Sequence, residues 1–238
     1  MESMAHRHFC RSCLTLSLSS TQEHGLTRLV QALPEGETSP EWACYETGLP
    51  RSLGLRIPAR SSFSAQGDSL KRMGEDFDAG YQVGEQIISL DYLWNKVRVQ
   101  GGAYGTRLSV SQNGTIYSYS YRDPSPAASL DANLGAGAYL VDFCERGEDI
   151  TPYIISTIAK SEPLESPCEK GLSADNAWFL GLDQDDFRRM RREMLETGAA
   201  KLRRFAGILN RFAAEGERCV VGHDEALKAC EGLNVTDL

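Results

Sequence analysis

The sequence predicts an α+β domain in which an antiparallel sheet carries helices on one face. Short segments in which apolar and polar residues alternate indicate strands. Asn113-Gly114, between two β-rich segments, is a strong signal for a hairpin and therefore for antiparallel pairing. The second half of the chain holds successive segments with helical spacing of apolar residues, so strands and helices do not alternate regularly as they would in a parallel α/β fold.

Period-two alternation defines the expected strands. In the first, Leu14, Leu16 and Leu18 alternate with hydroxyl residues. The expected hairpin joins two later strands through Ser111-Gln112-Asn113-Gly114. The strands expected from these patterns cover residues 13–19, 53–66, 104–110, 115–121 and 218–221.

Helical spacing defines the expected helices. The longest apolar stripe consists of Val83, Ile87, Leu90, Trp94 and Val97, and this helix should end near Gln100, before Gly101-Gly102. An earlier helix, with capping candidates Ser20 and Thr21, should end before Pro34. The expected helices cover residues 21–33, 83–100, 127–146, 150–160, 183–196, 199–214 and 224–230.

The length and composition are those of an ordinary globular chain. Its 238 residues, 41% hydrophobic and 24% charged, are enough to bury a core without disulfide or metal support, and they argue against collagen and coiled coil. We expect a single domain over residues 1–238, with 1–12 disordered and 34–52 forming a surface linker that is rich in turn-forming residues. The seven cysteines, an odd number at irregular spacing, are unlike a secreted disulfide framework.

Charge and hydropathy exclude several kinds of partner. Lys and Arg number 25 against 33 Asp and Glu, a net charge of −8, which disfavours a nucleic-acid binder. The arginine cluster around Arg188 is balanced by acidic neighbours, which favours a solvated helix surface. No apolar segment is long enough to span a membrane, and residues 13–20 are too short and too rich in hydroxyl groups for a secretion signal. We therefore expect no nucleic acid, no membrane and no secretion.

The N-terminus holds the one cluster of residue types that zinc prefers. His6, His8, Cys10 and Cys13 lie within eight residues, but a structural zinc site usually draws two ligands from a second segment. The alternative is a frayed terminus with incidental thiols. Neither H-E-x-x-H, H-x-x-E-H nor G-x-S-x-G occurs, so no peptidase metal site or serine nucleophile is predicted.

The segment 89–121 carries the most informative pair of residues. Arg98 lies at the end of the expected helix, and Tyr104 begins the next strand six residues later. Gly101-Gly102 lets the backbone turn sharply, so that a guanidinium and a phenol could face one groove. The alternative is that Arg98 complements the dipole of the helix C-terminus and Tyr104 is an aromatic residue at the edge of the core.

A family resemblance rests on this segment and on several others. LDYLWNKVRVQGGAYG, with YSYRDP downstream and GLRIPA upstream, closely resembles the C-terminal domain of presequence protease, a subfamily of the pitrilysin and insulinase metallopeptidases. The likeness extends to LTLSLSS, ALPEGE and LDQDDFRRMRREML, and so covers almost the whole chain.

The resemblance implies a shell of four related α+β domains, of which the first holds zinc in an H-x-x-E-H motif and the last closes over the peptide. This chain would be the last domain: non-catalytic alone, substrate-binding, and part of a zinc metalloendopeptidase that degrades short unfolded peptides. By resemblance, Arg98 and Tyr104 contact the substrate, and Tyr104 stabilises the carbonyl oxygen. Zinc would belong to the complete enzyme and lie in a separate N-terminal half. The alternative is an inactive orphan domain that serves as a protein-binding or scaffold module.

The same resemblance implies the partners and the compartment. The expected partners are a zinc-bearing N-terminal peptidase half and an unstructured peptide, which the net charge of −8 would favour if it is basic. A domain normally covered by its neighbours should expose apolar surface, so we expect a homodimer or poor solubility when it is isolated. The family suggests cytoplasm for a bacterial chain and the mitochondrial or plastid matrix for a eukaryotic one.

Overall fold

A computed structural model describes residues 9–18, 20, 25–36 and 48–237. The chain divides into two compact units. The larger contains residues 49–163 and 184–238, and the smaller contains residues 1–48 and 164–183. The expectation of a single domain, with a disordered start and a surface linker, stays a prediction.

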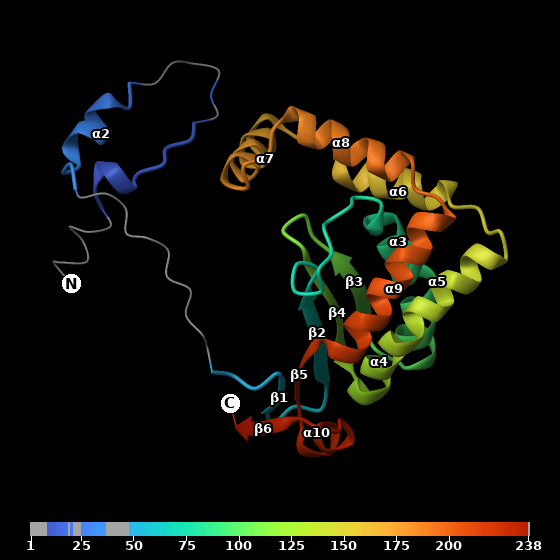
Figure 1. The fold of residues 1–238 in the computed structure, drawn as a ribbon. Helices are drawn as coiled ribbons and strands as arrows, with labels where there is room; N and C mark the ends of the chain where they lie inside the picture. Colours follow the sequence, from blue (N-terminus) through green and yellow to red (C-terminus); the bar gives the residue numbers. More distant parts are fainter. Residues whose placement is uncertain (1–8, 19, 21–24, 37–47, 238) are drawn as a thin grey trace. The chain divides into compact units, whose positions relative to one another are not determined.

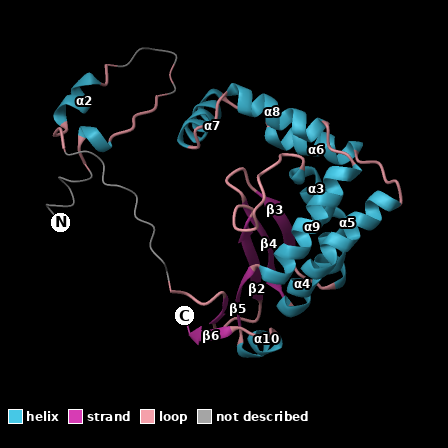
Figure 2. Cartoon of the chain, viewed as in Figure 1, coloured by secondary structure: helices cyan, strands magenta, loops and turns pink. Residues whose placement is uncertain are grey.

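The larger unit is built on a six-stranded mixed sheet in the order β3-β4-β2-β5-β1-β6 (Figures 1 and 2). Strands β3, β4, β2 and β5 pair antiparallel, whereas β1 runs parallel to both of its neighbours. The α+β class is confirmed, but the sheet is not wholly antiparallel, since an alternating pattern does not encode strand direction. The strands are β1 (Ser52–Arg56), β2 (Ser62–Ser69), β3 (Gly105–Val110), β4 (Thr115–Asp123), β5 (Glu217–Gly222) and β6 (Asn234–Asp237).

The hairpin β3–β4 forms as predicted, and other strands differ. Gly114 takes a left-handed φ of 83° in its turn, and the Gly114 amide donates to the Ser111 carbonyl at 2.9 Å. The single strand expected over 53–66 is two strands, β1 and β2, which lie on opposite sides of β5. Strand β6 is additional to those predicted, while β5 is confirmed.

Helices cover one face of the sheet, as predicted (Figure 2). The core between them and the sheet contains Ile116 from β4, Leu140 from α5, and Phe205 and Phe212 from α9, each at most 1% exposed. The helix expected over 127–146 narrows to a 3-10 turn at Asn133–Gly135. There the side-chain amide of Asn133 donates to the side chains of Gln66 and Ser118 in the sheet. The helices of this unit are α3 (Tyr81–Ile87), η2 (Ile88–Gln100), α4 (Pro126–Ala132), α5 (Ala136–Glu145), α6 (Thr151–Ser161), α8 (Gln184–Leu195), α9 (Ala199–Glu215) and α10 (Asp224–Ala229).

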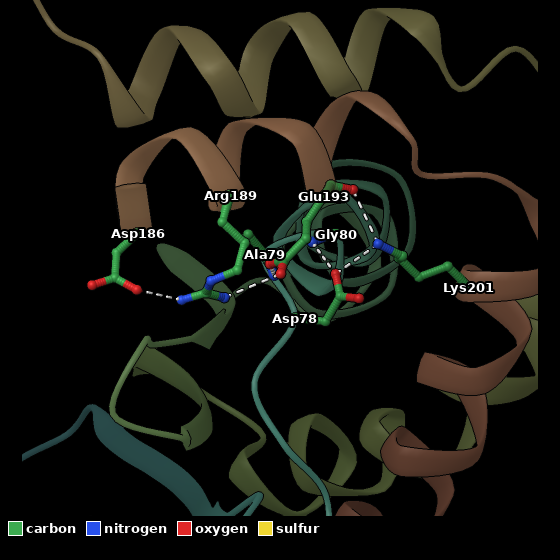
Figure 3. A network of polar contacts seen from close by, with 7 residues as sticks. All are labelled: Asp78, Ala79, Gly80, Asp186, Arg189, Glu193 and Lys201. Carbon is green, nitrogen blue, oxygen red and sulfur yellow. Dashed lines mark hydrogen bonds and ion pairs between the residues drawn. The ribbon is translucent and has the colours of Figure 1, made fainter. Parts of the chain in front are cut away.

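The N-terminus of α3 is fixed by a polar network (Figure 3). The Asp78 carboxylate accepts hydrogen bonds from the Gly80 amide at 2.7 Å and from Lys201 Nζ at 2.8 Å. Glu193 accepts from the Ala79 amide at 2.9 Å, and its backbone carbonyl accepts from Lys201 at 3.1 Å. These bonds satisfy amides that a helix start leaves without intrahelical partners, and they tie α3 to α8 and α9.

The smaller unit departs from the expected strand over 13–19. Residues 14–18 form no strand, a three-residue turn occupies Arg11–Cys13, and Ser19 lies outside the described residues. This prediction is wrong because alternation supplies an apolar face but no partner strand: Leu14, Leu16 and Leu18 are 38–53% exposed. The helix expected over 21–33 is present in its described part as α2, Thr27–Ala32.

Helix α7, Pro167–Phe179, was not predicted, although the sequence carries its start signal. Ser166 and Glu169 form a capping box, in which each side chain accepts from the other residue's amide, and Pro167 follows at the first helical position. Across the described residues of both units, no helix is long and apolar enough to cross a membrane.

Candidate functional site

The site begins with an unusual helix. Helix η2 continues α3 with π-type winding, in which amides bond to carbonyls five residues back, as Gly101 does to Lys96 at 3.0 Å. The wider turn changes which side chains face the core. Leu93 and Val97 are buried, whereas Leu90 and Trp94 are 47% and 40% exposed, so the predicted apolar stripe is wrong at these two positions.

Two tyrosines hold η2 in this winding. The Tyr92 hydroxyl donates to the Ala132 carbonyl at 2.9 Å, and the Tyr153 hydroxyl of α6 donates to the Asp91 carboxylate. Burial and this bond to Asp91 raise the pKa of Tyr153, so its phenol stays protonated as the donor. The helix is therefore anchored at Asp91 and Tyr92, just before Trp94.

The outward turn of Trp94 places its ring beneath Arg98. The Arg98 guanidinium carbon lies 3.9 Å from the Trp94 ring centroid, a close cation–π contact. Within the described part of the chain, Arg98 forms no ion pair with a carboxylate. The aromatic ring therefore orients a charge that stays available for a ligand.

The structure brings Tyr104 to this guanidinium. Gly102, with a left-handed φ of 80°, turns the chain from η2 into β3, and the Arg98 guanidinium carbon lies 6.0 Å from the Tyr104 ring centroid. The Tyr104 ring is 57% exposed rather than packed into the core. The two residues that the sequence singled out therefore lie together at an exposed corner of the sheet, where both can reach one ligand.

Arg122 is a third member of the site, to which the sequence assigned no role. Its guanidinium carbon lies 5.6 Å from the Tyr104 ring centroid, and its carbonyl accepts from the Tyr104 amide at 3.3 Å. Among the described residues, Arg122 alone combines a side chain with a left-handed φ, of 48°. The buried Asp123 next to it accepts from Ser120 and from the Ser125 amide at 2.8 Å, and so holds this turn. The Arg122-Asp123-Pro124 sequence after the hairpin is the feature from which this turn could have been predicted.

A row of aromatic rings extends from the corner along β4. The Tyr104 and Tyr121 ring centroids are 5.3 Å apart, and Tyr119 and Tyr117 continue the row at 6.4 and 6.3 Å. Gly105 makes room for it, because a Cβ there would lie 2.2 Å from the Tyr121 ring. The row lies on the sheet face opposite the core, since the alternate residues of β4, among them Ile116, are buried.

Side chains from the helices fix β3, the strand that follows Tyr104, at its outer edge. Ser89 bonds both the amide and the carbonyl of Leu108 at 3.1 Å, and the Val110 amide donates to Glu85 at 2.9 Å. Arg107 also donates to Glu85, at 2.8 Å, and the pKa of Arg107 is raised by this carboxylate. The edge is thus covered along this stretch, and the strand is locked to the helix that carries Arg98.

The residues suggested for metal binding do not form a site in the described part of the chain. His6 and His8 lie outside the described residues. Cys10 is 1% exposed, with its sulfur 3.2 Å from the Ser12 hydroxyl, and Cys13 closes the same turn. No group of three or more His, Cys, Asp or Glu side chains that could hold a metal occurs among the residues that the structure describes. Cys10 and Cys13 therefore belong to no group that could hold zinc among the described residues.

Comparison with solved structures defines the fold. The chain is similar to pitrilysin, with a TM-score of 0.60 and 14% identity over 89% of this chain and 24% of that one. It is also similar to the peptidase M16 inactive domain from Pseudomonas fluorescens, with a TM-score of 0.54 and 13% identity over 82% of this chain and 48% of that one. The fold is thus that of a domain of the pitrilysin and insulinase metallopeptidases, as the resemblance implied.

Sequence comparison defines the family. The model of the PreP C-terminal domain matches residues 54–223. Protein HypA of Clostridium perfringens is 32% identical over 192 residues, 79% of this chain. Presequence protease 1, chloroplastic/mitochondrial, of Arabidopsis thaliana is 29% identical over 209 residues, 87% of this chain. The chain therefore belongs to the family of presequence protease C-terminal domains, and it spans 19% of the length of each of these two relatives.

Proposed function

We propose that this chain is the non-catalytic, substrate-binding domain of a zinc metalloendopeptidase that degrades short unfolded peptides. The observation that carries the proposal is the corner formed by Arg98 and Tyr104. An oriented guanidinium and a phenol that is 57% exposed lie side by side, held by the Trp94 ring and by a strand locked to the same helix. Family membership supports a role in peptide hydrolysis.

Tyr104 and Arg98 would have different roles. A carbonyl oxygen gains negative charge as its amide bond is cleaved, and a phenol donor aimed at that oxygen stabilises the charge. Tyr104 has this role, and Arg98 holds the peptide in place beside it. Zinc belongs to the complete enzyme, in a separate N-terminal half that is the chain's main partner.

The assembly and the compartment follow from the same proposal. The isolated chain forms homodimers, because the tyrosine row and Phe63, which is 39% exposed, leave aromatic surface open on the sheet. The relative in Arabidopsis is named chloroplastic/mitochondrial and the one in Saccharomyces cerevisiae mitochondrial. A eukaryotic chain would therefore work in the organelle matrix and a bacterial one in the cytoplasm.

Complementation tests the proposal. A quenched fluorescent peptide is incubated with this chain, with the zinc-bearing N-terminal part of a presequence protease, and with both. We expect cleavage only in the mixture, with its loss on chelation of the metal. Cleavage by this chain alone would contradict the non-catalytic role. Stable association of the two parts without cleavage would instead support a protein-binding or scaffold module.

A further inference from the structure

We propose that Arg98 and Arg122 form a binding site for a carboxylate of the peptide. The two arginines precede and follow Tyr104 in the sequence, and their corner would select peptides that carry an anionic group. The inference rests on the proposed peptide-binding function and names the substrate chemistry of the same site. The bound carboxylate is either the free C-terminus of the peptide or an acidic side chain, and both present the same two oxygens.

The arginines near the corner differ in their partners. Of the arginines on the sheet near the corner, Arg107 is already bound by the buried Glu85 at 2.8 Å. Arg98 and Arg122 contact aromatic rings and form no ion pair with a carboxylate within the residues that the structure describes. Asp123, the acidic neighbour of Arg122, is fully buried and accepts from Ser120 and Ser125. Two cations therefore lie within 6.0 Å of the Tyr104 ring centroid without an ion-paired carboxylate among the described residues.

The backbone at Arg122 maintains this arrangement at a conformational cost. A side chain in the left-handed region is uncommon, and a glycine would adopt this conformation without strain. Arg122 nevertheless occupies it, with its carbonyl bonded to the Tyr104 amide and its guanidinium beside the Tyr104 ring. Such an outlier at an exposed position points to a function of the side chain.

Donor chemistry also favours a carboxylate. Guanidinium groups match the two oxygens of a carboxylate with paired N–H donors, and such charge-assisted bonds are stronger than bonds to a neutral carbonyl. The Trp94 ring shields one face of Arg98 from water. A carboxylate offers two charged oxygens to the guanidinium groups, whereas a peptide carbonyl offers one neutral oxygen, and the Tyr104 hydroxyl stays available for the bond that is cleaved. The positive charge at this corner thus attracts an anionic group, whereas the net charge of −8 favours basic peptides at long range.

The test measures binding of the full chain to three short peptides by calorimetry. The first lacks Asp and Glu and ends in a free carboxylate, the second is its C-terminal amide, and the third is the amide with one internal Glu. We expect the free acid to bind at least about fivefold more tightly than the amide, with a preference that weakens as salt is raised. Recovery of affinity by the third peptide would identify an acidic side chain as a sufficient ligand, and its failure would restrict the site to the C-terminus.

Two variants connect the preference to Arg122. R122Q removes the guanidinium, and R122G removes it while relieving the left-handed strain, so that folding is not at risk. Both should reduce the preference for the acid to below about twofold. R192Q is the matched control, because Arg192 is exposed on α8 and its substitution changes the net charge equally; this variant should keep the preference.

Several outcomes would overturn the inference: equal binding of acid and amide, a preference that survives in both R122Q and R122G, equal loss in R192Q, or no binding of any of the peptides. The proposed function is judged separately, by cleavage in the complementation mixture. Equal binding of acid and amide together with cleavage there would leave the peptide-binding role intact and remove only the carboxylate site.

Discussion

Trp94 shows how much of the site depends on the placement of one side chain. The spacing of apolar residues assigned it to the buried stripe, but π-type winding turns it outward to lie 3.9 Å from the Arg98 guanidinium. The residue that supports Arg98 therefore could not be identified from periodicity, because the number of residues per turn is itself set by the packing of η2 against its neighbours.

Replacing Trp94 tests this support directly. W94L should weaken peptide cleavage in the complementation mixture by about two- to fivefold, mainly through KM, because a cation–π contact at such a site contributes about 0.5–1 kcal/mol. The melting temperature should change little, since the ring is 40% exposed. L90A, at a position 47% exposed on the same helix, is the control. Equal effects of the two variants on KM would show that Trp94 does not position Arg98.

Gly105 is the other residue whose identity the site requires. G105A should lower the free energy of unfolding by about 1–3 kcal/mol, because its Cβ would lie 2.2 Å from the Tyr121 ring and displace it. G67A, in β2 of the same sheet, is the matched control: its Cβ would have no atom nearer than 3.9 Å. Urea unfolding of both variants measures the difference. A G105A protein as stable as G67A would mean that the aromatic row does not need this gap.

At the scale of the elements, local signals predicted the hairpin, the later helices and β5, because Asn113-Gly114 and apolar stripes act within a few residues. Two features depended on distant partners and were not predictable in this way. Strand β1 is parallel to β5, more than 160 residues away, and residues 14–18 alternate like a strand without one to pair with. The role of Arg98 and Tyr104 was expected from the family resemblance, whereas the place of Arg122 in the site became apparent only in the structure.

The polar network at the start of α3 should stabilise the packing of α3 against α8 and α9 (Figure 3). A double-mutant cycle with D78N and K201M should give a coupling of about 1 kcal/mol, because these side chains are only 30% and 21% exposed. The pair Asp224–Lys228, which is 46% and 75% exposed on α10, serves as the control and should couple by less than about 0.5 kcal/mol. Similar coupling in both pairs would argue against a structural role for the network.

The loop after β2 provides a pH-dependent contact with α9. Arg204 and Arg211 donate to Glu75 at 2.9 and 2.5 Å, and together they lower the pKa of Glu75 below its ordinary value of 4.5. A carboxyl whose pKa is lowered by folding stabilises the protein above its unfolded pKa, and this contribution is lost as the pH falls through the lowered value.

The variant E75Q should therefore be less stable than the native chain at pH 7, by roughly 1–2 kcal/mol. The difference should shrink as the pH falls below about 4.5. Unfolding in urea at several pH values measures it, with E231Q, an exposed position, as the control. A difference between E75Q and the native chain that does not depend on pH would contradict this contribution.

At the scale of the whole molecule, the chain corresponds to one domain of much longer relatives. It spans 19% of the length of HypA and of the Arabidopsis presequence protease, and its described residues offer no metal site. Under the proposed function, the exposed corner and the tyrosine row would supply hydrogen-bond donors and aromatic surface to a peptide. We therefore propose that Tyr104 acts on a peptide bond whose cleavage requires groups of another domain.

The most direct measurement is kcat/KM for peptide cleavage by the complementation mixture with Y104F. We predict a decrease of at least about tenfold, equivalent to about 1.4 kcal/mol of lost transition-state stabilisation, since only the hydroxyl is removed. Y117F, at the far end of the same row, should leave the rate within about twofold of the native value. An unchanged rate for Y104F in an active mixture would contradict the account, because the phenol would then have no part in binding or stabilising the substrate.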